Sequence, residues 1–188
     1  MSIEKDKLNS INVAVIGGNH HNTLGVIRSL GEQGINRENI HVLLIGNHIA
    51  DRNIVSVSKY VLKRNVNHDE SYDMIVKWLM ELAKDKIKRV VICCSDGASE
   101  VVISNRNILS NNFYLPSIKF DINYLMEKSV QGKIAMKCGM KIPKCTVITC
   151  RNHVDWNCFP CITKPLKSII GAGKYDICIA TSQNELHA

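Results

Sequence analysis

The first 120 residues alternate between short apolar runs and segments with helical spacing. Largely β-branched apolar runs cover residues 11–16, 40–45 and 89–94. Residues 22–30 and 75–82 place apolar side chains every three or four positions, which is the spacing of one helix face. Short, continuously apolar runs separated by helices are typical of buried parallel strands. The pattern predicts an α/β fold in which a Rossmann-like parallel sheet forms a first domain over residues 1–120.

Weaker signals lie between these runs. Residues 60–63 favour a short strand, residues 98–110 a weaker helix, and residues 113–116 an extended segment. Asn67 and Glu70 have the spacing of a capping box, which predicts that a helix begins behind them.

The pattern changes after residue 120. Residues 125–137 predict a helix that ends at Gly139, and Pro143 prevents its continuation. Three further strands are expected at residues 145–148, 161–164 and 176–179. Ser182 and Glu185 have capping-box spacing and open another helix, after which the sequence stops. We therefore predict that residues 121–188 begin an α+β domain with antiparallel strands, and we expect a larger protein to have been cut within this domain.

Composition limits the class of protein. The chain has 188 residues, of which 45% are hydrophobic and 22% charged, and this is enough to form a core. No apolar run reaches the roughly 18 residues of a membrane span, and the N-terminal residues lack the apolar region of a signal peptide. Eight cysteines without an export signal indicate free thiols in a reducing compartment, so a cytoplasmic location is expected.

The net charge of +7 is concentrated in the second domain, where residues 121–188 carry nine Lys/Arg and five Asp/Glu. Such a bias favours an anionic partner. Aromatic residues make up only 5% of the chain, whereas single-stranded nucleic acids are bound by aromatic side chains set among basic ones. No nucleic-acid partner is therefore expected.

A glycine pair, Gly17 and Gly18, follows the first apolar run, at the position where α/β sheets bind phosphates and small anions. The dinucleotide fingerprint G-x-G-x-x-G is absent, and residues 46–48 (GNH) replace the acidic ribose ligand after the second run. NAD binding is thus disfavoured. Gly17, Gly18 and Asn22 are candidates for contacting a small substrate, and a simple strand-to-helix turn is the alternative.

Lys164 ends an apolar run and precedes a glycine-containing loop, residues 167–174. Burying an ammonium group is costly unless it meets an anion, and phosphate is the natural partner beside a glycine loop. Lys128 lies beside Glu127 on a predicted helix, where a solvent-exposed face is the favoured explanation of the residue taken alone. A plain hairpin turn also explains Gly171 and Gly173.

Cys158 and Cys161 have C-x-x-C spacing, with Cys145 and Cys150 upstream. Zinc binding and a redox pair are alternatives to packing, but zinc needs four ligands and a redox thiol needs a helix N-terminus. No paired carboxylates and no Ser/His/Asp set stand out, so we assign neither catalytic residues nor metal ligands.

Taken in order, these motifs resemble the ATP-grasp superfamily of carboxylate–amine ligases, and in particular proteins similar to D-aspartate ligase and carbamoyl-phosphate synthase. Residues 126–128 (MEK) and 139–146 (GMKIPKCT) resemble the "D-K … a-G-i-x-v-P-x-t" signature of the family. Residues 160–165 (PCITKP) and 171–174 (GAGK) resemble its "P-v-i-x-K-P" strand and glycine-rich flap. Residues 13–18 (VAVIGG) and 22–31 (NTLGVIRSLG) are similar to the beginning of its preATP-grasp domain.

The resemblance implies that Lys128 and Lys164 contact ATP phosphates, and that Gly171 and Gly173 belong to the flap that covers them. It implies that Gly17, Gly18 and Asn22 face the substrate carboxylate. The expected chemistry is activation of a small carboxylate by ATP to an acylphosphate, followed by attack of an amine or thiol. Mg²⁺ is the implied cofactor, and the first domain is expected to contribute to homodimer contacts.

The sequence departs from the family in two ways. Glu127 replaces the usual aspartate, and the flap has fewer glycines. In the family the adenine-binding segment and the magnesium ligands lie further along the chain, so we expect these residues alone to be inactive. The alternatives are a non-catalytic Rossmann-like module that binds a nucleotide or sugar nucleotide, and a fragment of an NAD(P)-linked oxidoreductase.

Overall fold

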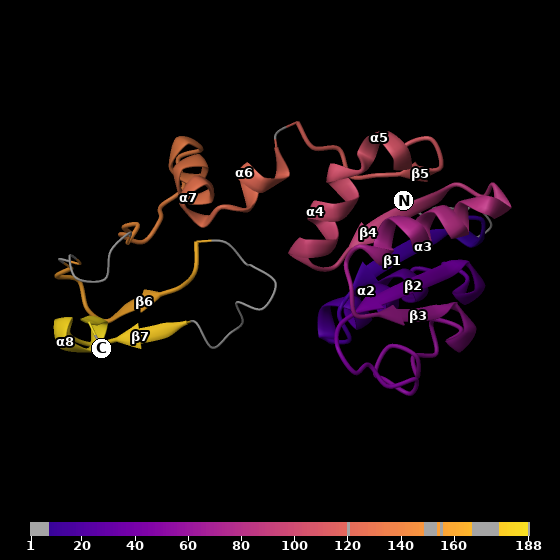
Figure 1. Cartoon of the computed structure of the whole chain (residues 1–188), viewed down its shortest axis with the longest axis horizontal. Coiled ribbons are helices and arrows are strands. Elements are labelled where there is room, and N and C mark those ends of the chain that lie inside the picture. The colour runs from indigo at the N-terminus through magenta and orange to yellow at the C-terminus, as the bar shows by residue number, and fades with distance from the viewer. Residues whose placement is uncertain (1–7, 120, 149–153, 155, 167–176, 188) are drawn as a thin grey trace. The chain divides into compact units, whose positions relative to one another are not determined.

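The computed structural model describes residues 8–119, 121–148, 154, 156–166 and 177–187. The chain divides into two compact units, residues 1–119 and 120–188, which we call unit 1 and unit 2 (Figure 1). Among the described residues, no helix has the length and apolar character required to cross a membrane.

Unit 1 contains a five-stranded parallel sheet with the strand order β3-β2-β1-β4-β5. The strands are β1 (Val13–Gly17), β2 (Ile40–Ile45), β3 (Val66–Asp69), β4 (Arg89–Cys93) and β5 (Phe113–Tyr114). The chain runs outward from β1 to β3 and then returns to place β4 on the other side of β1. The order of the strands therefore reverses between β1 and β4.

Helices cover both faces of this sheet. They are α2 (His21–Glu32), α3 (Met74–Leu82), α4 (Asp96–Ser104) and α5 (Arg106–Leu109). One core joins Ala14 and Ile16 of β1 to α3, α4 and α5, and the other joins Val13 and Val15 to Ile27 of α2. Adjacent residues of β1 thus enter opposite cores, because successive side chains of a strand point to opposite faces. Both faces need apolar side chains, which is why the strands are continuously apolar.

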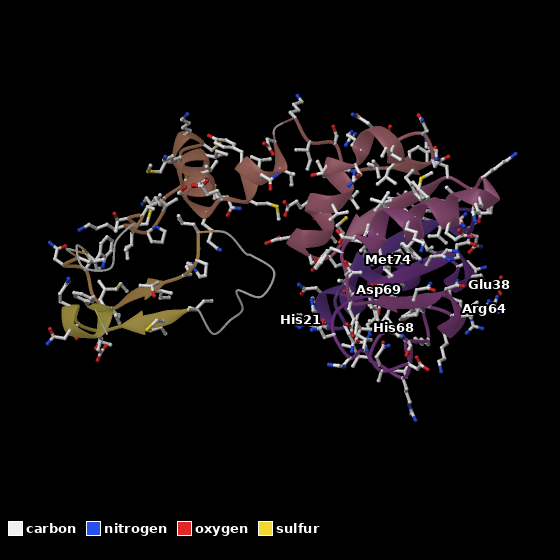
Figure 2. All side chains as sticks on the ribbon, viewed as in Figure 1. His21, Glu38, Arg64, His68, Asp69 and Met74 are labelled. Atoms are coloured by element: carbon white, nitrogen blue, oxygen red, sulfur yellow. The ribbon has the colours of Figure 1, made fainter. Side chains whose placement is uncertain are left out.

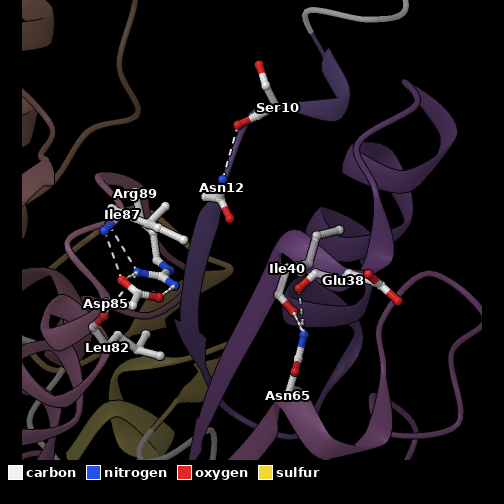
Figure 3. Close-up of polar contacts among 9 residues, drawn as sticks. All are labelled: Ser10, Asn12, Glu38, Ile40, Asn65, Leu82, Asp85, Ile87 and Arg89. Carbon is white, nitrogen blue, oxygen red and sulfur yellow. Dashed lines mark hydrogen bonds and ion pairs between the residues drawn. The ribbon is translucent and has the colours of Figure 1, made fainter.

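A buried arginine lies at the end of the sheet where the parallel strands begin. Arg89 is 2% exposed. Its guanidinium donates to the carbonyls of Leu82 and Ile87 and pairs with the carboxylate of Asp85 (Figure 3). The hydrogen bond from Arg89 lowers the pKa of Asp85. On strand β2, which is separated from β4 by β1, burial and the charge of Arg89 lower the pKa of His41.

A buried amide ties β3 to β2 at the same edge. The side-chain amide of Asn65 donates to the carbonyls of Glu38, at 2.9 Å, and of Ile40, at 3.3 Å (Figure 3). These carbonyls come before and at the beginning of β2, so a single side chain secures the approach to both strands.

Unit 2 is smaller and has less regular structure. It contains α6 (Ile122–Met126), α7 (Lys128–Lys137), α8 (Gln183–His187) and the antiparallel strands β6 (Cys161–Thr163) and β7 (Cys178–Ala180). Gly139 has φ = 75° just after α7, where a left-handed residue ends a helix. Glu185 donates its N–H to the Oγ of Ser182, and its carboxylate accepts from the backbone of Thr181.

The α/β class, the parallel sheet and the separate antiparallel strands agree with the sequence prediction. Three local predictions are wrong. Residues 60–63 form no strand, because Tyr60 and Val61 pack into the α2 core. Asn67 is in β3 rather than in a helix cap, because its backbone pairs with β2. Residues 145–148 form no strand, and Val147 and Ile148 are exposed.

Two predicted helices are each divided in two. Asn105 separates α4 from α5, and Glu127, which has an extended backbone, separates α6 from α7. The second break makes Lys128 the first residue of a helix.

Candidate functional site

Lys128 is held to the segment that follows β6 by two hydrogen bonds. Its backbone N–H donates to the carbonyl of Leu166 at 3.0 Å. Its Nζ donates to the carbonyl of Pro165 at 2.7 Å. The first N–H groups of a helix have no partner within the helix, so Leu166 satisfies one of them. The Nζ hydrogen bond thus joins Lys128 to a residue 37 positions further along the chain.

Lys164 precedes Pro165 in the sequence, so the Lys128 side chain reaches a carbonyl one residue further along the chain than Lys164. Lys128 is half-buried and Lys164 is exposed, so the expected burial of the Lys164 ammonium is wrong. A lysine ammonium has three N–H donors, so up to two more remain on Lys128 for a ligand. The Lys128 ammonium can therefore still donate to an anion such as a phosphate group. Gly171 and Gly173 lie outside the described residues.

Glu127 turns its carboxylate back toward the first turn of α7. The hydroxyl of Ser129 donates to Glu127 Oε1. A negative charge at this end of a helix is stabilised by the helix dipole. Glu127 thus supports the beginning of α7, and with it the position of Lys128.

Beside these lysines the two-stranded sheet exposes apolar side chains. Ile162 of β6 lies opposite Ile179 of β7, and they are 58% and 65% exposed. A directly opposed pair of branched apolar side chains forms a small flat surface. Unit 2 therefore combines cationic groups with an apolar surface at β6.

In unit 1, close packing explains the glycine pair after β1. A Cβ atom on Gly17 would lie 2.5 Å from Thr23 Oγ1 and 2.7 Å from Cys94 Cβ. A Cβ on Gly18 would lie 2.8 Å from the ring of His20. The buried hydroxyl of Thr23 donates to the Gly18 carbonyl at 2.7 Å. The loop is therefore fixed tightly against the start of α2.

Helix α2 begins immediately after this loop. His20 caps it, and its Nδ1 accepts from the backbone N–H of Asn22 at 3.3 Å. Figure 2 shows His21 at the beginning of this helix, where it is exposed. Asn22 and Ser29 line a shallow groove of about 560 Å³ between α2 and Ile92 of β4. The Asn22 side chain is thus on the flank of α2.

Helix α4 begins at the same edge of the sheet, after β4. Ser95 caps it and accepts from the N–H of Ala98 at 3.3 Å. The hydroxyl of Tyr72 lies 3.5 Å from Ser95 Oγ, and a Cβ on Gly97 would be 2.6 Å from the Tyr72 ring. Because β1 and β4 are neighbours, the N-termini of α2 and α4 both lie at the position where the strand order reverses. Ligands of parallel α/β sheets bind in such a crevice.

Sequence reasoning missed three residues that shape this edge. Ser95 follows an apolar run and precedes a helix, so its capping role could have been read from the sequence. Thr23 and Tyr72 gave no such signal, because their importance depends on contacts across the fold.

Two cysteines lie where β4 ends, and Cys94 is next to Gly17. Burial raises the pKa of Cys93 to about 12 and also raises that of Cys94. Both thiols stay protonated at neutral pH, in agreement with their interpretation as core residues. Within the part of the chain that the structure describes, no three His, Cys, Asp or Glu side chains gather as metal ligands would.

Comparison with known proteins identifies no relative, because no family model and no curated protein matches this chain.

Proposed function

We propose that this chain supplies the substrate-binding domain and the first part of the ATP-binding domain of an ATP-grasp carboxylate–amine ligase. The observation that carries the proposal is the 2.7 Å hydrogen bond from Lys128 Nζ to the Pro165 carbonyl. It joins one of the two motif lysines to the segment that directly follows β6, which contains the other. The order of motifs and the parallel sheet, taken as a Rossmann-like preATP-grasp domain, support the same assignment.

In this proposal Lys128 and Lys164 hold the phosphates of ATP. Ile162 and Ile179 offer an apolar surface to its base, and Gly171 and Gly173 cover the phosphates. The substrate carboxylate is oriented in unit 1, at the point where the strand order reverses between β1 and β4. Gly17, Gly18 and the N-termini of the two helices there contact it, and Asn22 lies at the side. Backbone N–H groups and the positive end of a helix dipole both favour a carboxylate there.

The reaction begins when a carboxylate oxygen attacks the γ-phosphorus of ATP. The bond to ADP breaks, and an acylphosphate forms. An amine or thiol then attacks the carbonyl carbon, and inorganic phosphate leaves. The lysines stabilise negative charge on the transferred phosphoryl group. Mg²⁺ bound with the ATP would offset this charge, and in the ATP-grasp family its ligands lie further along the chain, so no residue described here is assigned to the metal.

ATP binding by the chain tests the proposal. Lys164→Met should weaken ATP binding at least tenfold, which corresponds to about 1.4 kcal/mol for the loss of one phosphate contact. Lys128→Gln removes the charge but keeps an N–H for the Pro165 carbonyl, so it separates phosphate binding from the structural clamp. Lys133→Met is the matched control, because Lys133 is exposed on the same helix.

Isothermal titration with ATP gives the result directly. Equal affinities for the wild type, Lys164→Met and Lys128→Gln would contradict the proposal. ATP binding that resists these changes but is lost in Gly18→Val would instead favour the alternative, a nucleotide-binding or sugar-nucleotide-binding module centred on unit 1.

A further inference from the structure

The ammonium group of Lys144 lies among three side chains that follow one another in the sequence. Lys144 Nζ is 3.0 Å from Asn157 Oδ1 and 3.3 Å from Cys158 Sγ. It also lies 5.1 Å from the centre of the Trp156 ring, within the range of a cation–π contact. The amide oxygen and the ring thus hold the ammonium against the sulfur.

Both reacting groups are open to solvent. Lys144 and Cys158 are exposed, and the Cys158 thiol can donate in turn to Asn157 Oδ1 at 3.6 Å. A small oxidant can therefore reach the sulfur without any movement of the fold. The nucleophilic form of cysteine is the thiolate, and the Lys144 ammonium is positioned to pair with that charge.

We propose that Cys158 and Lys144 form an oxidation-sensitive pair that hydrogen peroxide converts into a covalent sulfur–nitrogen bond. A sulfenic acid forms first on Cys158, and the amine of Lys144 then condenses with it. Condensation of sulfenic acids with thiols or with nitrogen is established chemistry. Here the nitrogen is a lysine amine already in contact with the sulfur. This inference does not depend on the proposed function.

The steps balance when they start from a Cys158 thiolate and a Lys144 ammonium. The Cys158 thiolate attacks one oxygen of hydrogen peroxide, the O–O bond breaks, and the departing hydroxide takes a proton from the Lys144 ammonium. The neutral amine then attacks the sulfur of the sulfenic acid, the S–O bond breaks, and the second hydroxide takes a proton from the nitrogen. One peroxide is reduced, two waters form, and the sulfur is oxidised by two electrons.

Two other cysteines among the described residues lack this combination. Cys93 is kept protonated by burial, which raises its pKa to about 12. Cys138 is exposed, but none of the hydrogen bonds found among the described residues joins its sulfur to a lysine. Cys138 is therefore the matched control for exposure without an adjacent ammonium.

The experiment treats the full chain with hydrogen peroxide and maps the products by mass spectrometry. The expected product has lost about 2 Da, links the peptides that contain residues 144 and 158, resists trypsin after Lys144, and is reversed by dithiothreitol. Cys158 should react about tenfold faster than Cys138. Lys144→Arg keeps the charge but should abolish the link, leaving Cys158 about 16 Da heavier as a sulfenic acid that dimedone traps.

Three results would overturn the proposal. The first is a Cys158–Cys161 disulfide as the main product in the wild type. The second is a link that persists in Lys144→Arg. The third is oxidation of Cys158 no faster than that of Cys138. Because these readouts are masses and rates for the free chain, they hold whether or not the chain binds ATP.

Discussion

The two units use their apolar residues in opposite ways. Unit 1 buries them in two cores on the faces of one sheet, and the strand residues Ala14, Val15 and Ile16 are fully buried. In unit 2 the described buried apolar residues are Val130, Val154 and Ala180. Many others are exposed, including Ile162 and Ile179. Since burial of apolar surface is the main stabilising contribution to folding, unit 1 should account for most of the stability of the chain.

The difference also separates two kinds of site. In unit 1, at the end of the sheet where the strand order reverses between β1 and β4, packed side chains such as Thr23 hold the glycine loop in place. In unit 2, the position of Lys128 depends on two hydrogen bonds to the segment after β6. We expect the first site to be formed without ligand, and the second to gain order when an anion joins the lysines.

The largest expected effect tests where the stability lies. Ile16→Ala removes a fully buried side chain from unit 1 and should lower the free energy of unfolding by about 3 kcal/mol. Ile162→Ala removes a side chain that is 58% exposed and should cost less than about 0.5 kcal/mol. Urea denaturation measures both. Equal losses would show that the apolar pair of unit 2 is as important to folding as the core of unit 1.

Acid should weaken unit 1 through His41. Burial and the nearby Arg89 lower the pKa of this histidine in the folded chain, so the unfolded chain takes up its proton first as the pH falls. Stability is therefore complete above the ordinary pKa of 6.5 and declines below it. Asp85 contributes separately at lower pH, because Arg89 lowers its pKa and the stabilisation is lost as the carboxylate is protonated.

The measurement is the free energy of unfolding at pH 7.5 and pH 5.5 for the wild type and His41→Gln. The wild type should lose stability over this interval, by less than the Ile16→Ala effect, and the variant should lose less. The same slope in both proteins would mean that His41 is not the responsible group.

The sequence predicted unit 1 better than unit 2, and the reason is physical. Strands buried on both faces must be continuously apolar, so β1, β2 and β4 were visible as runs. Residues 145–148 have a similar composition but no strand beside them, and pairing cannot be read from a single segment. The strand predicted at residues 60–63 was wrong for a different reason. Apolar loop residues such as Val61 also enter a core, so apolar character alone does not indicate a strand.

The candidate sites, too, could be predicted from the sequence only in part. Gly17, Gly18 and Ser95 lie where strands end, and such positions follow from the apolar runs alone. The contact of Lys128 with Pro165 depends on the break at Glu127, which the regular spacing of residues 125–137 concealed. The Lys144–Cys158 pair joins segments whose approach no local pattern indicates.

The smallest expected effect asks whether the two units unfold separately. Each has one glycine inside a helix with room for a methyl group. A Cβ on Gly25 of α2 would meet nothing within 4 Å, and a Cβ on Gly132 of α7 would make an ordinary 3.7 Å contact with Ile142. Replacing a helical glycine by alanine stabilises a helix by about 0.5–1 kcal/mol. Gly25→Ala should therefore raise the stability of unit 1, and Gly132→Ala that of unit 2.

Hydrogen exchange followed by mass spectrometry distinguishes the units in the intact chain. If they unfold independently, Gly25→Ala should slow exchange from the global opening of β1, β2 and β4 while leaving α7 unchanged, and Gly132→Ala should do the reverse. The unit with fewer buried residues should also exchange faster in the wild type. Slower exchange in both units from either substitution would show that they unfold as one cooperative body, and the contrast between a self-sufficient unit 1 and a weakly packed unit 2 would then be wrong.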